Sequence, residues 1–86
     1  MPPPTRSVSQ TAAAGFEFEQ LGLTQREAEV LLWLSRGKTN YEIGVILGAK
    51  RDTIRTHVSS ILRKLSVENR TAAAVSALEL LRTGHF

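Results

Sequence analysis

An all-α fold of four helices is predicted by three features of this 86-residue sequence. Two capping boxes, Thr24-Gln-Arg-Glu27 and Thr39-Asn-Tyr-Glu42, each mark the start of a helix. Apolar residues recur at helical spacing after both boxes, and again between Ile54 and Leu65. Gly37 and Gly48 follow the first two apolar patterns, where helices typically end. These features predict short helices joined by tight turns.

The first two predicted helices follow the two capping boxes. The first begins after Thr24, has an apolar stripe and ends at Ser35-Arg36-Gly37, so it is interpreted as a scaffold helix. Its stripe comprises Ala28, Leu31, Leu32 and Leu34, with Val30 and Trp33 adding width. The second has about two turns and is closed by Gly48. Its apolar residues are Ile43, Ile46 and Leu47.

The third and fourth predicted helices have different surfaces. The third runs from about Arg51 to Leu65 and buries Ile54, Val58, Ile61 and Leu65. The fourth begins after Asn69 and continues to Gly84, with Ala73, Ala77 and Leu80 facing inward. Val75 and Leu78 are then left partly exposed, which is typical either of an interface or of scattered surface residues.

Length and composition limit the organisation of the chain. The 86 residues suffice for one small domain, and the absence of cysteine excludes disulfides and thiolate metal sites. Residues 1–15 combine three prolines with small polar residues and are predicted to be a flexible tail or linker. They can equally be a frayed terminus or a connection to another domain. Residues 16–86 form the predicted helical domain.

Charge and hydropathy limit the partners and the location. A net charge of +3 is compatible with nucleic acid, although many proteins with this charge bind none. No apolar run approaches the roughly 18 to 20 residues that span a bilayer, and the N-terminal sequence does not resemble a secretion signal. We therefore expect a cytoplasmic chain with no membrane partner.

The spacing of three residues within the second and third helices indicates a helix-turn-helix. Gly44 has no side chain to hold two crossing helices apart, and Gly48 tolerates the positive φ of a tight turn. Ile54 is then placed to fill the gap between the helices, with Ile43, Leu47 and Ala49 beside it. Double-stranded DNA is the leading candidate partner of such a motif.

The polar face of the third helix suits the major groove. Arg55 can donate two hydrogen bonds to guanine, while Thr56 and Ser59 present hydroxyl groups to neighbouring positions, so these three are the predicted base readers. Cations at the margins suit phosphate contact. Six residues are predicted to contact the DNA backbone. They are Lys50, Arg51, Arg63 and Lys64 on or beside the third helix, and Thr39 and Asn40 at the start of the second helix. The same charges also occur on any solvated amphipathic helix.

Other chemistries have little support in the sequence. His57 lies between the apolar and polar faces, where a packed or phosphate-touching role is more common than metal ligation. No catalytic motif or carboxylate–histidine cluster is present, so we expect neither an enzyme, nor a metal site, nor a cofactor, nor a small-molecule ligand in this domain.

Residues 23–75 resemble the LuxR-type (GerE-like) helix-turn-helix domain of bacterial transcription regulators. The resemblance rests on Leu-Thr-Gln-Arg-Glu at the first helix, then on matches through all later helices. These matches are Gly37, Asn40, Glu42-Ile43, Thr53-Ile54, His57, Lys64-Leu65 and Asn69-Arg70.

The resemblance implies a three-helical core plus a fourth, dimerisation helix. It implies that the third helix enters the major groove, and that Thr53, His57 and Lys64 lie near the DNA backbone. On the fourth helix, Thr71, Val75 and Leu78 are the expected dimer contacts. Such domains usually follow a sensor or phosphoreceiver domain, although free-standing members of similar size exist.

The sequence departs from the family pattern at four positions. Gly44 replaces a usual alanine, which is expected to loosen the second helix by up to about 1 kcal/mol. Lys50 stands where Ser or Thr normally caps the recognition helix, a loss of about 1 kcal/mol that Asp52 partly recovers. Ala49 replaces a larger apolar residue, and Ser66 replaces a glycine.

The leading hypothesis is therefore sequence-specific DNA binding by a bacterial transcription regulator, as a homodimer on paired half-sites and with RNA polymerase as a further candidate partner. The alternative is a helical protein-interaction module that uses the strip from Ala72 to Leu81, with no specific DNA target. Steep salt dependence of DNA binding distinguishes the first from the second.

Overall fold

The computed structural model describes residues 17–83, and within this range helices are its only regular secondary structure. A helical turn at residues 17–19 precedes four helices: α2 (Gln25–Ser35), α3 (Asn40–Leu47), α4 (Arg51–Leu65) and α5 (Arg70–Thr83). These bounds confirm the four predicted helices and their order. The predicted tail, residues 1–15, lies outside the described residues.

Local capping explains why each of the first two helices begins where it does. The Thr24 hydroxyl accepts a hydrogen bond from the Glu27 amide at 3.1 Å, and the Glu27 carboxylate accepts one from the Thr24 amide at 2.9 Å. Thr39 and Glu42 form the same reciprocal pair at the start of α3, at 3.1 and 2.8 Å. Both predicted capping boxes are confirmed, and each satisfies two otherwise unpaired amide groups.

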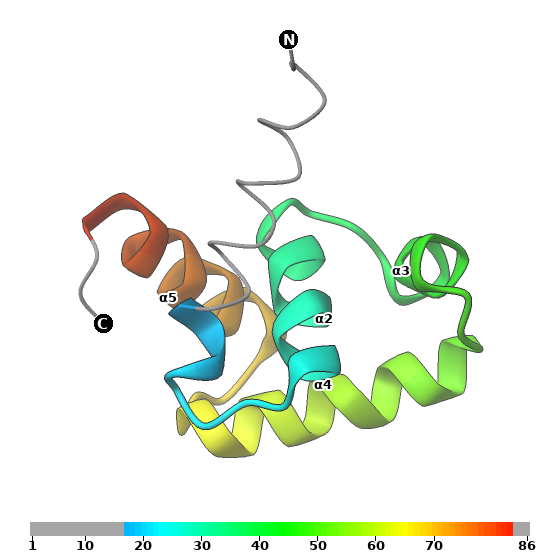
Figure 1. The fold of residues 1–86 in the computed structure, drawn as a ribbon, viewed down its shortest axis with the longest axis horizontal. Coiled ribbons are helices and arrows are strands. Elements are labelled where there is room, and N and C mark those ends of the chain that lie inside the picture. The colour runs from blue at the N-terminus through cyan, green and yellow to red at the C-terminus, as the bar shows by residue number, and fades with distance from the viewer. Residues whose placement is uncertain (1–16, 84–86) are drawn as a thin grey trace, which may run out of the picture.

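The long helix α4 lies along one side of the molecule and contacts each of the other three helices (Figure 1). α3 packs near its N-terminal end, and α5 lies toward its opposite end with α2 between them (Figure 1). α3 and α5 share no packed face within the described residues. The two ends of α4 are therefore supported by different parts of the chain.

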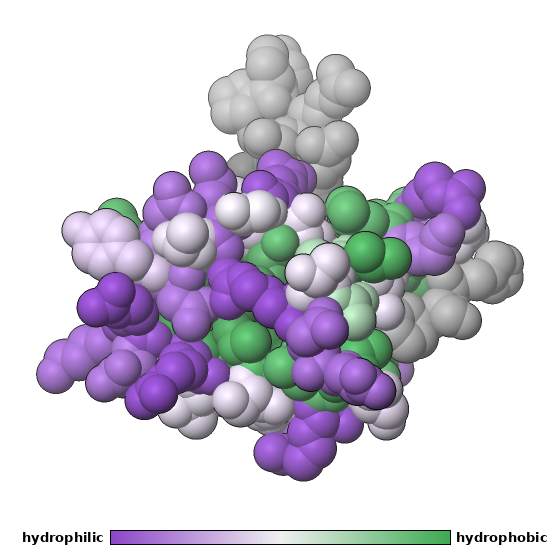
Figure 2. Space-filling model, turned by 180° about the vertical axis from the view of Figure 1, so that it is seen from behind, coloured by the Kyte–Doolittle hydropathy of each residue, from purple (hydrophilic) through white to green (hydrophobic). Residues whose placement is uncertain are grey.

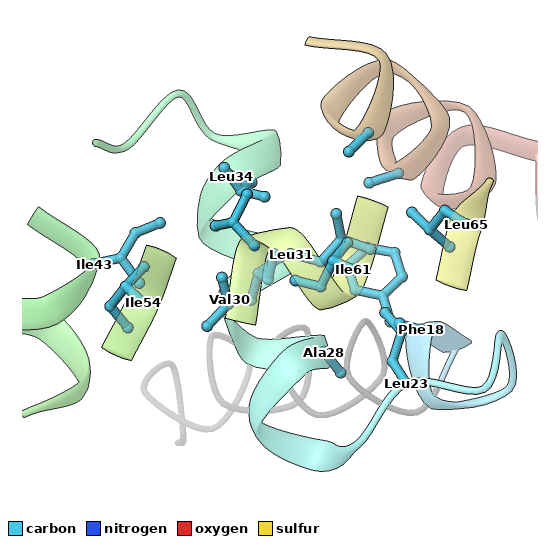
Figure 3. Close-up of a cluster of buried hydrophobic side chains, with 14 of the residues drawn as sticks. Phe18, Leu23, Ala28, Val30, Leu31, Leu34, Ile43, Ile54, Ile61 and Leu65 are labelled. Carbon is cyan, nitrogen blue, oxygen red and sulfur yellow. The ribbon is translucent and has the colours of Figure 1, made fainter. Parts of the chain in front are cut away.

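A single hydrophobic core joins the helices (Figure 3). Leu31 from α2 and Ile61 from α4 are fully buried at its centre, together with Phe18 from the helical turn that precedes α2. Ile43 and Ile54 meet at the side where α3 packs on α4 (Figure 3). Phe18 is a core residue that the sequence interpretation did not identify, since it lies outside the helical stripes that were considered.

The stripe predicted for α4 is confirmed, whereas that of α3 is narrower than its sequence suggested. Ile54, Val58, Ile61 and Leu65 are all buried. In α3 only Ile43 and Gly44 are buried, Leu47 packs at the core edge, and Ile46 is exposed. Ile46 is exposed because α3 contacts the rest of the domain along one face only, and that face is occupied by Ile43 and Gly44.

Candidate nucleic-acid interface

The turn between α3 and α4 is built on two glycines that have different functions. Gly48 has φ 70° and ψ 36°, the left-handed conformation that a glycine adopts without steric penalty. Gly44 lies under the turn, where a Cβ atom would approach the Ala49 carbonyl oxygen to 2.5 Å. The close approach predicted at Gly44 is therefore present, and an alanine there requires the turn backbone to move.

The N-terminus of α4 has no side-chain cap. Lys50 occupies the cap position with an extended backbone and makes no capping hydrogen bond, as its sequence position predicted. Asp52 lies in the first turn, where a carboxylate interacts favourably with the positive end of the helix dipole. The helix therefore begins with an exposed lysine and uncapped amide groups at the end that is supported by α3.

All three predicted base readers are exposed on α4. The Arg55 guanidinium is 3.7 Å from the Asp52 carboxylate, an exposed pair of the kind that contributes little to stability. The Thr56 hydroxyl donates to the Asp52 carbonyl oxygen at 3.2 Å, which leaves its oxygen lone pairs and its methyl group available. None of these side chains contributes to the core, so all three are accessible to a groove.

Some of the residues predicted to contact the DNA backbone are exposed, and others already make hydrogen bonds within the domain. Lys50, Arg51, Thr53 and Arg63 are exposed, and His57 is half-buried. Thr39 is exposed, but its amide is already donated to Glu42 within the capping box, so only its hydroxyl hydrogen is available to a phosphate.

Lys64 has a partner that the sequence interpretation did not identify. Its ammonium donates to the Glu27 carboxylate at 2.8 Å, and the Ser60 hydroxyl donates to the second carboxylate oxygen at 2.6 Å. Glu27 is only 5% exposed, whereas the Lys64 side chain is 31% exposed, so this is a partly buried ion pair that joins α2 to α4. Lys64 therefore has a structural role, and its contact with DNA stays a prediction.

The protonation of Glu27 follows from these contacts. Desolvation acts to raise the pKa, but hydrogen bonds from Lys64, Ser60 and the Thr24 amide outweigh it and lower the pKa of Glu27 from 4.5 to about 2. The carboxylate consequently remains ionised at neutral pH. The capping box had indicated only the local role of this residue, because its partners on α4 are more than 30 residues away in the sequence.

Asn40 is likewise held by a distant residue. Its side-chain oxygen accepts a hydrogen bond from the Arg70 guanidinium at 2.6 Å, and a second nitrogen of Arg70 donates to the Lys38 carbonyl oxygen at 2.6 Å. Burial lowers the pKa of the Arg70 guanidinium. A signal for this contact was present in the sequence, because a cation in the first turn of a helix opposes the helix dipole and so needs another partner.

The outward face of α5 carries exposed apolar side chains beside polar and charged ones. Val75 and Leu78 are 58% and 50% exposed, and Leu81 and Thr71 are exposed as well, while Ala73, Ala77 and Leu80 pack inward as predicted. Hydrophobic residues gather on the side of the molecule where α5 lies, and hydrophilic residues predominate on the opposite side (Figure 2). The residues predicted for dimerisation therefore form an accessible strip.

A second exposed apolar area lies on α3. Tyr41 and Val45 are well exposed, and Ile46 is partly so. A shallow groove of about 500 Å³ runs from this area to the turn, lined by Tyr41, Gly44, Val45, Gly48, Ala49, Lys50 and Arg51. None of the helices within residues 17–83 has the length and hydropathy that a bilayer span requires.

Comparison with known proteins agrees with this geometry. Residues 21–77 match the family model described as bacterial regulatory proteins, luxR family. The chain is 47% identical over 58 residues to the transcriptional activator protein SolR of Ralstonia nicotianae, a match that covers 67% of this chain and 25% of SolR. It is 51% identical over 55 residues to the transcriptional regulatory protein LiaR of Bacillus subtilis, covering 64% of this chain and 26% of LiaR.

A third relative is the quorum sensing-dependent transcriptional regulator RpaR of Rhodopseudomonas palustris, which is 48% identical over 58 residues, 67% of this chain and 24% of RpaR. The chain thus spans about a quarter of the length of these three relatives.

Proposed function

Because this chain belongs to the luxR family of bacterial regulatory proteins, whose helix-turn-helix is a DNA-binding domain, we propose that it reads a specific duplex sequence through α4. The observation that supports this most directly is the face of α4 that presents Arg55, Thr56 and Ser59 clear of the core, directly after the Gly44–Gly48 turn. An α-helix fits the major groove, and side chains of these types can bind base edges.

The proposed backbone contacts surround the base readers. Lys50, Arg51, Thr53 and Arg63 are exposed on or beside α4, and His57 is partly accessible. Thr39 and Asn40 lie at the start of α3, and Lys64 has ammonium hydrogens beyond the one that it donates to Glu27. Such contacts fix the position of the protein on the duplex without specifying its sequence.

We propose that the domain acts as a homodimer through the α5 strip of Thr71, Val75 and Leu78. These residues recur at helical spacing on the face opposite the buried Ala73 and Ala77. A symmetric dimer would place two copies of α4 on paired half-sites whose centres lie about one helical turn apart, roughly 10 bp. Action on bacterial DNA places the protein in the cytoplasm, and the role needs no catalysis and no cofactor.

RNA polymerase is the proposed protein partner, because a regulator on a promoter acts through the transcription machinery. The exposed α3 residues Tyr41, Val45 and Ile46 form an apolar area separate from the α5 strip and from the base readers. If this area contacts polymerase, Val45→Ala with Ile46→Ala would leave DNA affinity unchanged and abolish the regulatory effect in a purified transcription assay. Equal regulation by the variant would exclude this area as the contact.

The test of sequence reading is selection of bound duplexes from a random pool, followed by affinity measurements across a salt series. We expect a paired motif and a steep fall in affinity as salt rises, because phosphate neutralisation releases counterions. Arg55→Ala should cost about 1 to 3 kcal/mol and relax preference at one position, whereas Arg51→Ala should weaken binding to all sequences and reduce the salt slope by about one. No enrichment, with weak binding that ignores salt, would favour the protein-interaction alternative.

The test of dimerisation is the double variant Val75→Asp with Leu78→Asp, compared with Gln20→Asp with Gln25→Asp. Both pairs add the same charge at exposed positions, but only the first alters the α5 strip. We expect the first pair alone to lower the sedimentation coefficient and to lose preference for two half-sites over one. Unchanged sedimentation and retained affinity would exclude α5 as the dimer contact.

A further inference from the structure

Arg70 connects α5 to the start of α3, although these two helices do not pack against each other within residues 17–83. It is the first residue of α5, and its guanidinium donates to the side-chain oxygen of Asn40 and to the Lys38 carbonyl oxygen, each at 2.6 Å. Both acceptors belong to the segment that begins α3, and α3 and α5 share no packed face within the described residues. All three residues are half-buried. Within residues 17–83, the Arg70–Asn40 bond is therefore the one hydrogen bond between the side chains of α5 and α3, and the bond to Lys38 joins α5 to the segment just before α3.

The chemistry of arginine determines how the Asn40 amide is oriented. A guanidinium has donors and no acceptor, so the Asn40 side chain must turn its carbonyl oxygen toward Arg70. Its NH₂ group is then directed away from the guanidinium, and that group has no hydrogen-bond partner within residues 17–83. Without Arg70, the amide is free to rotate and to present its oxygen instead.

The position of Asn40 makes this orientation relevant to DNA. Asn40 is the first residue of α3, where backbone amide groups without helical partners and the helix dipole favour an anion. A phosphate placed there would be bound by hydrogen-bond donors and repelled by a carbonyl oxygen. The orientation in which NH₂ is available is the one that can donate to a phosphate.

We propose that Arg70 is a positioning residue for DNA binding, which holds the Asn40 amide with its NH₂ group available to a DNA phosphate. This inference rests on the proposed function, in which Asn40 contacts the backbone. It adds to that function a residue that need not touch DNA itself, and a connection through which the proposed dimer helix fixes a DNA contact at the start of α3.

The first test is Asn40→Asp, which should lower DNA affinity without lowering the stability of the domain. The carboxylate still accepts from Arg70, so the thermal midpoint of the domain should not fall. It has no donor for a phosphate and adds a negative charge, so affinity for the selected duplex should fall at least about tenfold. Asn69→Asp is the matched control, because Asn69 caps α5 by accepting from the Ala72 amide at 2.8 Å, which an aspartate does equally well. The control variant should keep most of the affinity.

The second test is a double-mutant cycle between Arg70→Ala and Asn40→Ala, measured on DNA affinity at a temperature where every variant is folded. If Arg70 acts through Asn40, each single variant should lose affinity about tenfold, and the double variant should lose little more. Arg70→Lys should restore part of the affinity, because lysine retains one of the two donations. Additive losses in the cycle would overturn the proposal, since they would show that Arg70 does not act through Asn40.

Failure of this inference is distinguishable from failure of the proposed function. If the wild-type chain selects no duplex, the proposed function is wrong. If the wild-type chain binds its duplex and Arg55→Ala weakens it, but Arg70→Ala and Asn40→Asp bind as tightly as the wild type, only the role of Arg70 is wrong.

Discussion

The two halves of α4 differ in the contacts that join them to the rest of the domain. The C-terminal half, residues 58–65, packs Val58, Ile61 and Leu65 into the core and is joined to α2 by the Glu27–Lys64 ion pair. The N-terminal half, residues 51–57, buries only Ile54, begins without a side-chain cap and has an exposed ion pair between Arg55 and Asp52. Residues 58–65, the anchored half, therefore place three side chains in the core, whereas residues 51–57, the exposed half, place only Ile54 there. Two of the proposed base readers, Arg55 and Thr56, lie in the exposed half, and Ser59 lies near the start of the anchored half.

The largest expected effect of this difference is on stability. Ile61→Ala, in the anchored half, removes a fully buried side chain at the centre of the core and should cost about 2 to 5 kcal/mol of unfolding free energy. Arg55→Ala, in the exposed half, should change it by less than about 0.5 kcal/mol. Urea denaturation of both variants measures this. Equal losses of unfolding free energy would show that both halves of α4 contribute equally to the stability of the domain.

The next effect is a dependence of stability on pH, caused by Glu27, whose carboxylate is bound by Ser60 and Lys64 of the anchored half. The pKa of Glu27 is lowered from 4.5 to about 2 on folding, so its ionised form stabilises the domain above pH 4.5, and this stabilisation is lost as the pH falls toward 2. The shift corresponds to about 3 kcal/mol.

Glu27→Gln isolates this contribution. The difference in unfolding free energy between the wild type and Glu27→Gln should be largest at neutral pH and should shrink as the pH falls from 4.5 to 2. Thr39 also lowers the pKa of Glu42, but that carboxylate is present in both proteins and cancels in the difference. A difference that does not vary with pH would mean that the Glu27 network contributes no ionic stabilisation.

A smaller effect should separate stability from DNA binding in the exposed half. Lys50→Ser supplies the missing cap of α4 and should raise the unfolding free energy by about 1 kcal/mol. The same change removes a cation beside the base readers, so DNA affinity should fall and its salt slope should decrease by about one. Thermal unfolding and a salt series on the same variant test both parts. A loss of stability would show that Lys50 has a native contact that serine cannot replace.

The smallest effect is expected where the anchored half ends. Ser66 has φ 57° and ψ 43°, and it is the one non-glycine residue with positive φ in the described part of the chain. Ser66→Gly should relieve this strain and add about 0.5 to 1 kcal/mol, without any change in DNA affinity. Thermal unfolding measures the gain, and a decrease would mean that the greater freedom of glycine in the unfolded chain outweighs the relief of strain.

Much of the fold was predictable because its signals are local. Capping boxes at Thr24 and Thr39 and the left-handed Gly48 each depend on a few neighbouring residues, and all are present in the structure. The exposure of Ile46 was not predictable from α3 alone, because it depends on how much of α3 the other helices cover.

In the candidate site, too, the features set by neighbouring residues were predictable and those set by distant residues were not. The exposure of Arg55, Thr56 and Ser59 follows from helical periodicity and was predicted. The partners of Glu27 and Arg70 were not, because each is brought close by the folding of residues at least 30 positions away. A local pattern gives the type of a side chain and its face, but it does not give its distant partner.

The separation of the proposed base readers from the core has a consequence for changing the preferred DNA sequence. Since Arg55, Thr56 and Ser59 are exposed and contribute no core packing, substitutions at these positions create no cavities, and under the proposed function they should alter recognition. A library that varies only these three positions should therefore consist mostly of folded members. In such a scaffold, new operators can be sought by exchanging side chains on one helical face while the architecture that supports them is left intact.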